Sequence, residues 1–205
     1  MAVMPDPSFI YLASQSPRRG QLLDQLGVRH AQLVPDDTED AEALEALRPA
    51  ELPQDYVQRV TSLKLKAARA RQRRRKLLYA PILCADTTVA LGRRILGKPA
   101  DADQARQMLA ALSGRSHRVL TAVVLGTDRT TLAALSVSRV QFATLSAADI
   151  DAYIASGQPF GKAGAYAIQS QMAGSVAHIA GSYSGIMGLP LFETAHLLRQ
   201  ARVRF

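Results

Sequence analysis

Four short segments of this 205-residue chain place charged side chains directly after predicted strands, where open α/β sheets bind ligands. The first is LASQSPRR, residues 12–19, in which a strand runs into a helix. Amides at a helix start are free and carry the positive end of the helix dipole, so they bind anions. The hydroxyls of Ser14 and Ser16 and the forked guanidiniums of Arg18 and Arg19 would add donors to phosphate oxygens. The alternative is a capped helix with two surface arginines.

The second segment is ADTTV, residues 85–89, which follows the apolar run ILCA. A half-buried carboxylate requires a cation, a metal ion or hydrogen bonds, because burial disfavours an isolated charge. Asp86 could therefore hold Mg²⁺ or orient a water for attack on phosphorus. The alternative is a carboxylate that only caps its own turn through Thr87 and Thr88.

The third and fourth segments contribute two lysines and an amide. In GKP, residues 97–99, a rigid proline follows Lys98, whose ammonium could neutralise charge on a transferring phosphoryl group. In KAGAYAIQS, residues 162–170, Lys162 and Gln169 lie among small residues that allow a ligand to approach closely. The amide of Gln169 could read a base edge with both a donor and an acceptor. A surface lysine and a glycine-rich turn are the alternatives.

Other catalytic chemistries have less support. Cys84 is the only cysteine and lies in an apolar run, which is typical of core packing rather than of a nucleophile. The spacing of His30, His117, His178 and His196 does not match a metal site. The chain contains no phosphate-binding P-loop, GxSxG or HExxH motif.

The elements that must position these segments alternate between strand and helix patterns. Strands are expected near residues 9–13, 82–91, 94–99, 117–127 and 131–145, with turns at Gly92 and at Asp128–Arg129. Helices are expected at residues 16–27, from about 55 into a basic run, and at 101–114, 146–157 and 190–199, with caps at Ser16, Asp101 and Ser146. The mixture predicts an α/β or α+β architecture with antiparallel strand pairs.

Composition and length limit the class of protein. With 48% hydrophobic and 20% charged residues, the chain is typical of a globular protein and unlike a disordered one. No apolar stretch approaches the roughly 20 residues of a membrane-spanning helix. The first residues lack the basic start and apolar core of a secretory signal, and a single cysteine fits a reducing compartment. We therefore expect a cytoplasmic protein that does not bind membranes.

The net charge of +8 comes from one segment. Residues 59–76 hold nine cations and no acids, and the rest of the chain has 16 cations against 17 anions. The segment could be a solvated helix face or a face that attracts anions. No aromatic residues are interleaved with these cations, so base stacking is not supported and we do not expect nucleic acid as a partner.

Taken in order, the motifs resemble the Maf (septum-formation) family of nucleoside triphosphate pyrophosphatases. The resemblance runs from about Phe9 to Leu198 and rests on LASQSPRRGQLLDQLG, ADTTV, ILGKPADADQARQMLAALSGRSHRVLTAV, KAGAYAIQS and GLPLFET. It implies cleavage between the α- and β-phosphates of a nucleotide with a divalent cation, Mg²⁺ or Mn²⁺. It also implies a single domain over residues 1–205, related to inosine-triphosphate pyrophosphatases, with a mixed twisted sheet flanked by helices and two lobes around a central cleft. The family is commonly homodimeric.

The resemblance also implies residue roles. Asp86 matches the catalytic acid, a metal-associated proton acceptor, and Glu39 matches a metal-binding glutamate whose usual acidic neighbour is Thr38 here. The family lysine could be Lys64 by its spacing or Lys66 by its KA context, and we favour Lys64. The other substrate-binding positions are Ser14, Ser16, Arg18, Arg19, Thr87, Lys98, Lys162 and Gln169.

Within the family, KAGAYAIQ with GLPLFET resembles the branch that acts on dTTP and UTP, whereas the branch that acts on 7-methyl-GTP is expected to differ there. Gly161 and Ser170 depart from the family pattern beside Lys162 and Gln169, so they bear on substrate preference more than on chemistry. Two alternatives remain open. One is a non-enzymatic regulator of cell division that binds through residues 59–76, and the other is an enzyme that removes modified pyrimidine nucleotides.

Overall fold

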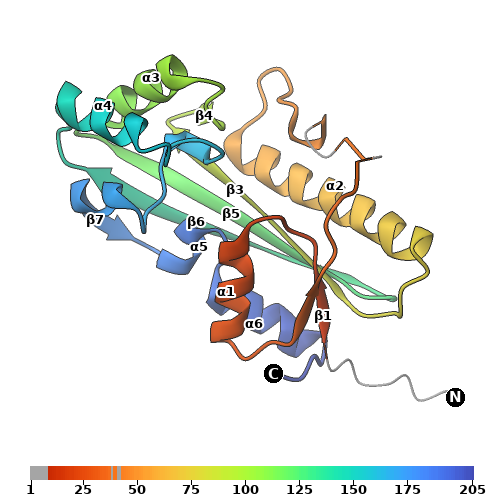
Figure 1. The fold of residues 1–205 in the computed structure, drawn as a ribbon. Helices are drawn as coiled ribbons and strands as arrows, with labels where there is room; N and C mark the ends of the chain where they lie inside the picture. The colour runs from red at the N-terminus through yellow and green to blue at the C-terminus, as the bar shows by residue number, and fades with distance from the viewer. Residues whose placement is uncertain (1–8, 38, 41–42) are drawn as a thin grey trace, which may run out of the picture.

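The computed structural model describes residues 9–205 except 38, 41 and 42. Its strands form one seven-stranded sheet in the order β2-β1-β3-β5-β6-β7, and β4 pairs with β3 (Figure 1). β1 is parallel to β2 and β3, and the other pairs are antiparallel. The strands are β1 (Ile10–Leu12), β2 (His30–Gln32), β3 (Ile82–Leu91), β4 (Arg94–Leu96), β5 (Ser116–Gly126), β6 (Thr131–Phe142) and β7 (Val176–Ala180). The predicted mixed sheet is thus confirmed.

The helices also follow the predicted start signals in most cases. Asp101 caps its helix by accepting a hydrogen bond from Gln104, and Ser146 with Asp149 forms a capping box. Ser16 occupies an N-cap position but makes no side-chain cap bond. The helices are α1 (Pro17–Gln25), α2 (Pro53–Arg74), α3 (Ala102–Leu112), α4 (Ala147–Ala155), α5 (Tyr183–Met187) and α6 (Leu191–Gln200), and the 3₁₀ turns are η1 (Ala43–Glu45), η2 (Ala163–Ala165) and η3 (Gln171–Ser175).

Helices cover both faces of the sheet. Along β3, Ile82 and Cys84 pack with Leu65 of α2, whereas Leu83 and Ala85 pack with α1 and α6 on the opposite face. This alternation is the two-residue repeat of a strand buried on both sides. At the far end of the long strands, α3 and α4 enclose a third cluster around η2 (Figure 1). Within the described residues, no helix combines the length and apolarity needed to span a membrane.

Two expectations about this segment conflict, and the structure decides between them. The strand covers residues 82–91 as predicted, so Asp86 does not follow a strand but lies inside β3, opposite Ala122 of β5. The strand continues through ADTTV because antiparallel pairing with β5 extends over Ala85–Ala90, so the polar residues remain in the ladder. The site is therefore built partly on the middle of the sheet. Cys84 is fully buried, as predicted, and burial raises the pKa of its thiol to about 12.

Candidate active site

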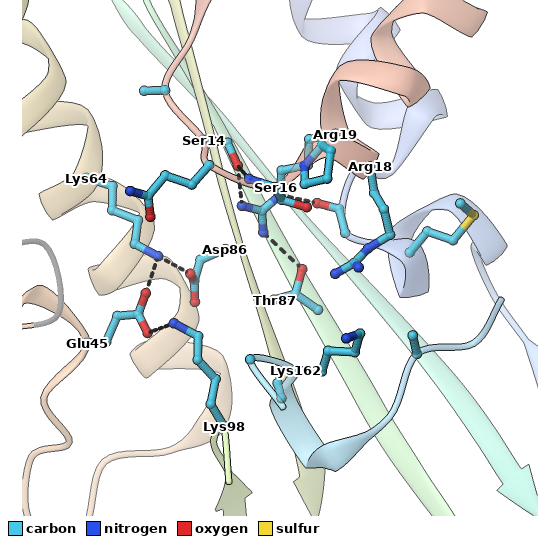
Figure 2. A pocket seen from close by; sticks show the side chains of 18 of the residues that line it. Ser14, Ser16, Arg18, Arg19, Glu45, Lys64, Asp86, Thr87, Lys98 and Lys162 are labelled. Atoms are coloured by element: carbon cyan, nitrogen blue, oxygen red, sulfur yellow. Dashed lines mark hydrogen bonds and ion pairs between the residues drawn. The ribbon is translucent and has the colours of Figure 1, made fainter. Parts of the chain in front are cut away.

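A pocket of about 650 Å³ opens between α2, the start of α1 and the segment around η2 (Figure 2). It collects residues from all four predicted segments, although these are far apart in the sequence. Lys66 is not among its lining residues, so Lys64 is the lysine that reaches the site. The sequence-predicted residues that line it are Ser14, Ser16, Arg18, Arg19, Glu39, Lys64, Asp86, Thr87, Lys98, Lys162 and Gln169.

Strand alternation in β3 sends the side chains of Asp86 and Thr87 to opposite halves of the pocket. Asp86 lies on the face of Cys84, toward α2, where Lys64 of that helix meets it at 2.5 Å. Thr87 lies on the other face, where its hydroxyl is 3.5 Å from Nη2 of Arg19. Two consecutive residues of one strand thus contact different parts of the site, Asp86 the lysine of α2 and Thr87 the arginine of α1.

The α2 half of the pocket is an alternating chain of charges. Nζ of Lys64 donates to Oδ1 of Asp86 and, at 2.7 Å, to Oε1 of Glu45. Oε2 of Glu45 accepts from Nζ of Lys98 at 2.8 Å (Figure 2). Oδ2 of Asp86 accepts no hydrogen bond from any described residue. This oxygen is therefore available to a ligand or a water.

Glu45 is a site residue that the sequence analysis missed. It lies in η1, in a connection without strong periodicity, and nothing in its local sequence marks it out. Burial opposes its ionisation, but the charges and hydrogen bonds of Lys64 and Lys98 outweigh burial and lower the pKa of its carboxyl. Glu45 is thus an anion that holds two lysine ammonium groups near Asp86.

The α1 half of the pocket is organised around Arg19. Its Nε donates to the carbonyl of Gly188 at 2.8 Å and its Nη1 to Oγ of Ser14 at 2.9 Å. Oγ of Ser14 also accepts from the backbone N–H of Ser16 at 3.1 Å. Burial lowers the pKa of Arg19, but a guanidinium stays charged in proteins. The loop before α1 is therefore held in place by a fixed positive charge.

Arg18 and Lys162 supply a second positive region beside Thr87, where Figure 2 shows both side chains pointing into the same space. Of the acceptors among the described residues, Nζ of Lys162 donates to the carbonyl of Phe160 alone, at 3.3 Å. Burial, with a smaller effect from the nearby charge of Arg18, lowers the pKa of Lys162. Neither cation forms an ion pair within the part of the chain that the structure describes. They are free to meet an anion.

Glu39 has different partners from Asp86. Its two carboxylate oxygens accept from Arg71 at 2.8 and 2.6 Å, and Oε1 also accepts from Arg74 at 2.7 Å. Hydrogen bonding from Arg71 is the main reason that the pKa of Glu39 is lowered to about 2. Arg71 is itself buried and donates to the carbonyl of Leu33, so it anchors this connection to α2. Thr38, its predicted neighbour in the motif, lies outside the described residues.

The remaining wall of the pocket is apolar. Tyr166 contributes to it, and its hydroxyl is 2.7 Å from Nε2 of the buried His117. Gly164 has a positive φ of 68°, and a Cβ there would come within 2.8 Å of the side chain of Val89. The other apolar lining side chains include Val119, Ile168 and Ile186. A pocket with cations on one side and apolar groups on the other suits a phosphorylated ligand with a planar, less polar part.

Comparison with known proteins gives a consistent result. The family described as Maf-like protein matches residues 9–201. Relatives from Polaromonas sp. and Ralstonia nicotianae, both named dTTP/UTP pyrophosphatase, are 61% and 63% identical over 201 and 195 residues. These matches cover 98% and 95% of this chain and 100% and 94% of the relatives. A relative of the same name from Albidiferax ferrireducens is 62% identical over 191 residues, covering 93% of this chain and 96% of its own.

Proposed function

The chain belongs to the Maf-like protein family, and on that premise we propose that it hydrolyses dTTP and UTP to the monophosphate and pyrophosphate. The observation that carries the proposal is Asp86, one oxygen of which accepts nothing from the described residues, in a pocket that also contains an apolar wall and two cations without an ion pair among those residues. The relatives that are about 60% identical to this chain are named for this activity. A cytoplasmic homodimer built on a single domain over residues 1–205 is part of the same proposal, as is the relation to inosine-triphosphate pyrophosphatases.

In the proposed reaction, Asp86 acts on the attacking water. Its Oδ2 would accept the water's proton while Oδ1 stays bound to Lys64, so the carboxylate is held in one orientation. Arg18, Arg19 and Lys162 would bind the triphosphate, and Lys98 would offset the charge that develops on the leaving pyrophosphate. Phosphoryl transfer depends mainly on positioning and charge stabilisation, so this set of residues is sufficient without a covalent nucleophile.

The acids of the pocket fit a divalent cation that is shared with the substrate. The carboxylates of Asp86 and Glu45 converge on a single ammonium group, Nζ of Lys64, and carboxylate oxygens are the ligands that Mg²⁺ prefers. Among the described residues no group of three or more acids, histidines or cysteines converges, which suits an ion that completes its shell with phosphate and water. Bound there, Mg²⁺ or Mn²⁺ would polarise the phosphate oxygens.

We propose that Asp86 and Glu45 hold this cation. Both oxygens of each glutamate already accept hydrogen bonds, but only Glu45 shares an ammonium group with Asp86, whereas Glu39 is held by Arg71 and Arg74. A titration with Mg²⁺ distinguishes the two glutamates. Glu45→Gln should raise the Mg²⁺ concentration needed for half-maximal turnover, whereas Glu39→Gln should leave it unchanged. The reverse result would assign the metal to Glu39, as the family resemblance implies.

The activity itself is tested by pyrophosphate release from dTTP, UTP, CTP, GTP, ATP and 7-methyl-GTP with Mg²⁺ or Mn²⁺. We expect selective turnover of dTTP and UTP. Preference for 7-methyl-GTP would reject the substrate assignment but keep the reaction, and no turnover of any nucleotide would reject both. Values of kcat/KM for 5-modified pyrimidine nucleotides then show whether the enzyme prefers modified substrates.

A further inference from the structure

The cations of residues 59–76 divide into two groups on α2 and just beyond it. Five of them form ion pairs with acids, and two of these five, Lys64 and Arg71, line the active-site pocket. No ion pair with a described acid is formed by the other four, Lys66, Arg69, Arg73 and Lys76. Lys66, Arg69 and Arg73 are three and four residues apart, so they share one face of the helix. This face is neither neutralised nor used by the proposed reaction.

These three cations surround a second pocket. It has a volume of about 280 Å³ and lies between α2 and the start of β6. Ser62, Leu65 and Thr131 complete its lining, which contains two hydroxyl groups and no acid. It shares no lining residue with the active-site pocket, so the two are separate sites along one helix.

The Arg69 side chain is fixed in this second pocket. Its Nη2 donates to the carbonyls of Thr127 and Thr130, at 3.0 and 3.2 Å, and to Oγ1 of Thr131 at 3.0 Å. These neutral acceptors orient the guanidinium without cancelling its charge. Its Nε and Nη1 donate to none of the described residues, so N–H groups on these two nitrogens remain free as separate donors.

Packing and local charge support a preformed site. A Cβ on Gly126 would lie 2.7 Å from Leu65 and 2.9 Å from Arg69, so α2 is seated tightly on the end of β5. The acid at the neighbouring turn, Asp128, accepts from Tyr79 and lies 3.6 Å from Arg129. It is therefore already engaged beside the pocket, and the three cations keep their excess positive charge.

From this arrangement we propose that the second pocket binds the phosphate groups of a small polyphosphate, either free pyrophosphate or the triphosphate of a nucleotide. Guanidinium donors and hydroxyls match phosphate oxygens in geometry and charge. The volume suits a chain of phosphates but is less than half that of the active-site pocket. No aromatic side chain lines it, so it offers no surface on which a base could stack.

The test is isothermal titration calorimetry of the full chain with inorganic pyrophosphate and, separately, with a non-hydrolysable α,β-methylene analogue of UTP. The variant Lys66→Ala/Arg73→Ala removes two exposed side chains of the second pocket. The matched control, Arg29→Ala/Arg139→Ala, removes the same charge from exposed positions elsewhere. Circular dichroism is the control for whether each variant is folded.

We expect two binding sites per chain in the wild type and in the control. The second-pocket variant should keep one site and lose affinity at the other by about tenfold or more, as expected for the loss of charged hydrogen bonds. The probe that binds more tightly at this site identifies the source of the phosphate groups. Because the active-site pocket supplies the remaining site, failure of this proposal is distinguishable from failure of the proposed function.

Three results would overturn the proposal. One is a single site per chain in the wild type for both probes. Another is an equal loss of affinity in the variant and in its control, which would indicate that the probes are attracted only by the net charge of the protein. The third is tight binding of an oligonucleotide that the variant abolishes, without a second pyrophosphate site, which would make this face a nucleic-acid surface.

Discussion

Replacing Asp86 with Asn tests whether this carboxylate accepts a proton or only holds Lys64 in place. Asn has nearly the same shape, so the variant removes the charge and basicity and keeps the volume. A general base contributes about 100- to 10,000-fold to a rate, so kcat should fall at least about 100-fold, or about 2.7 kcal/mol. Stability should change by less than about 2 kcal/mol, because Lys64 keeps its 2.7 Å bond to Glu45.

Glu45→Gln is the matched control, because Glu45 and Asp86 accept from the same ammonium group. The side chains of Glu45 and Lys64 are 26% and 20% exposed, so their ion pair is partly solvated. Its loss should cost about 1 kcal/mol of stability. Because the pair also positions Lys64, a loss of the same size in the transition state would lower kcat about fivefold at saturating Mg²⁺. Pyrophosphate release at saturating dTTP measures the rates, and urea denaturation measures the free energies of unfolding.

Two results would refute this reasoning. If Asp86→Asn keeps kcat within about fivefold of the wild type, the proton acceptor is another group. If the two variants lose activity equally, Asp86 acts only by positioning Lys64. A loss of activity matched by a loss of folded protein would be resolved by comparing rates at a temperature where the urea curves show both variants folded.

Three further predictions concern stability. Burial lowers the pKa of His117 from 6.5 to about 4, so its contribution of about 3 kcal/mol to the free energy of unfolding is complete above pH 6.5 and is lost as the pH falls toward 4. His117→Gln should therefore flatten the pH dependence of the free energy of unfolding from urea denaturation over that range, and an unchanged slope would show that this histidine does not cause the dependence. Gly164→Ala should destabilise by about 1–3 kcal/mol more than Gly157→Ala, which has a similar positive φ but open space, and equal urea midpoints would contradict the packing argument. Glu39→Gln should cost on the order of 3 kcal/mol, because Arg71 then stays buried without its anion, and a thermal midpoint equal to that of the wild type would disprove it.

Much of the fold could be predicted from local sequence. The caps at Asp101 and Ser146 and the turn at residues 127–130 mark element ends that the structure reproduces within a few residues. The sequence predicts the start of α2 near residue 55, and the helix begins at Pro53, where a proline fits the first helical position. These features are local, because a cap or a turn requires only neighbours along the chain.

The amino-acid sequence is sufficient to predict which residues could serve phosphate chemistry, since all eleven predicted side chains line one pocket. The partners of these side chains, by contrast, follow from the tertiary structure. Lys64 lies on the face of α2 that meets β3 and lines the active-site pocket, whereas Lys66 lines the second pocket. Glu45 and Asp86, which are 41 positions apart in the sequence, accept hydrogen bonds from the same Lys64. The tertiary structure also pairs Glu39 with Arg71. Such pairs depend on how the helices pack against the sheet, and this packing cannot be predicted from residue types and local periodicity.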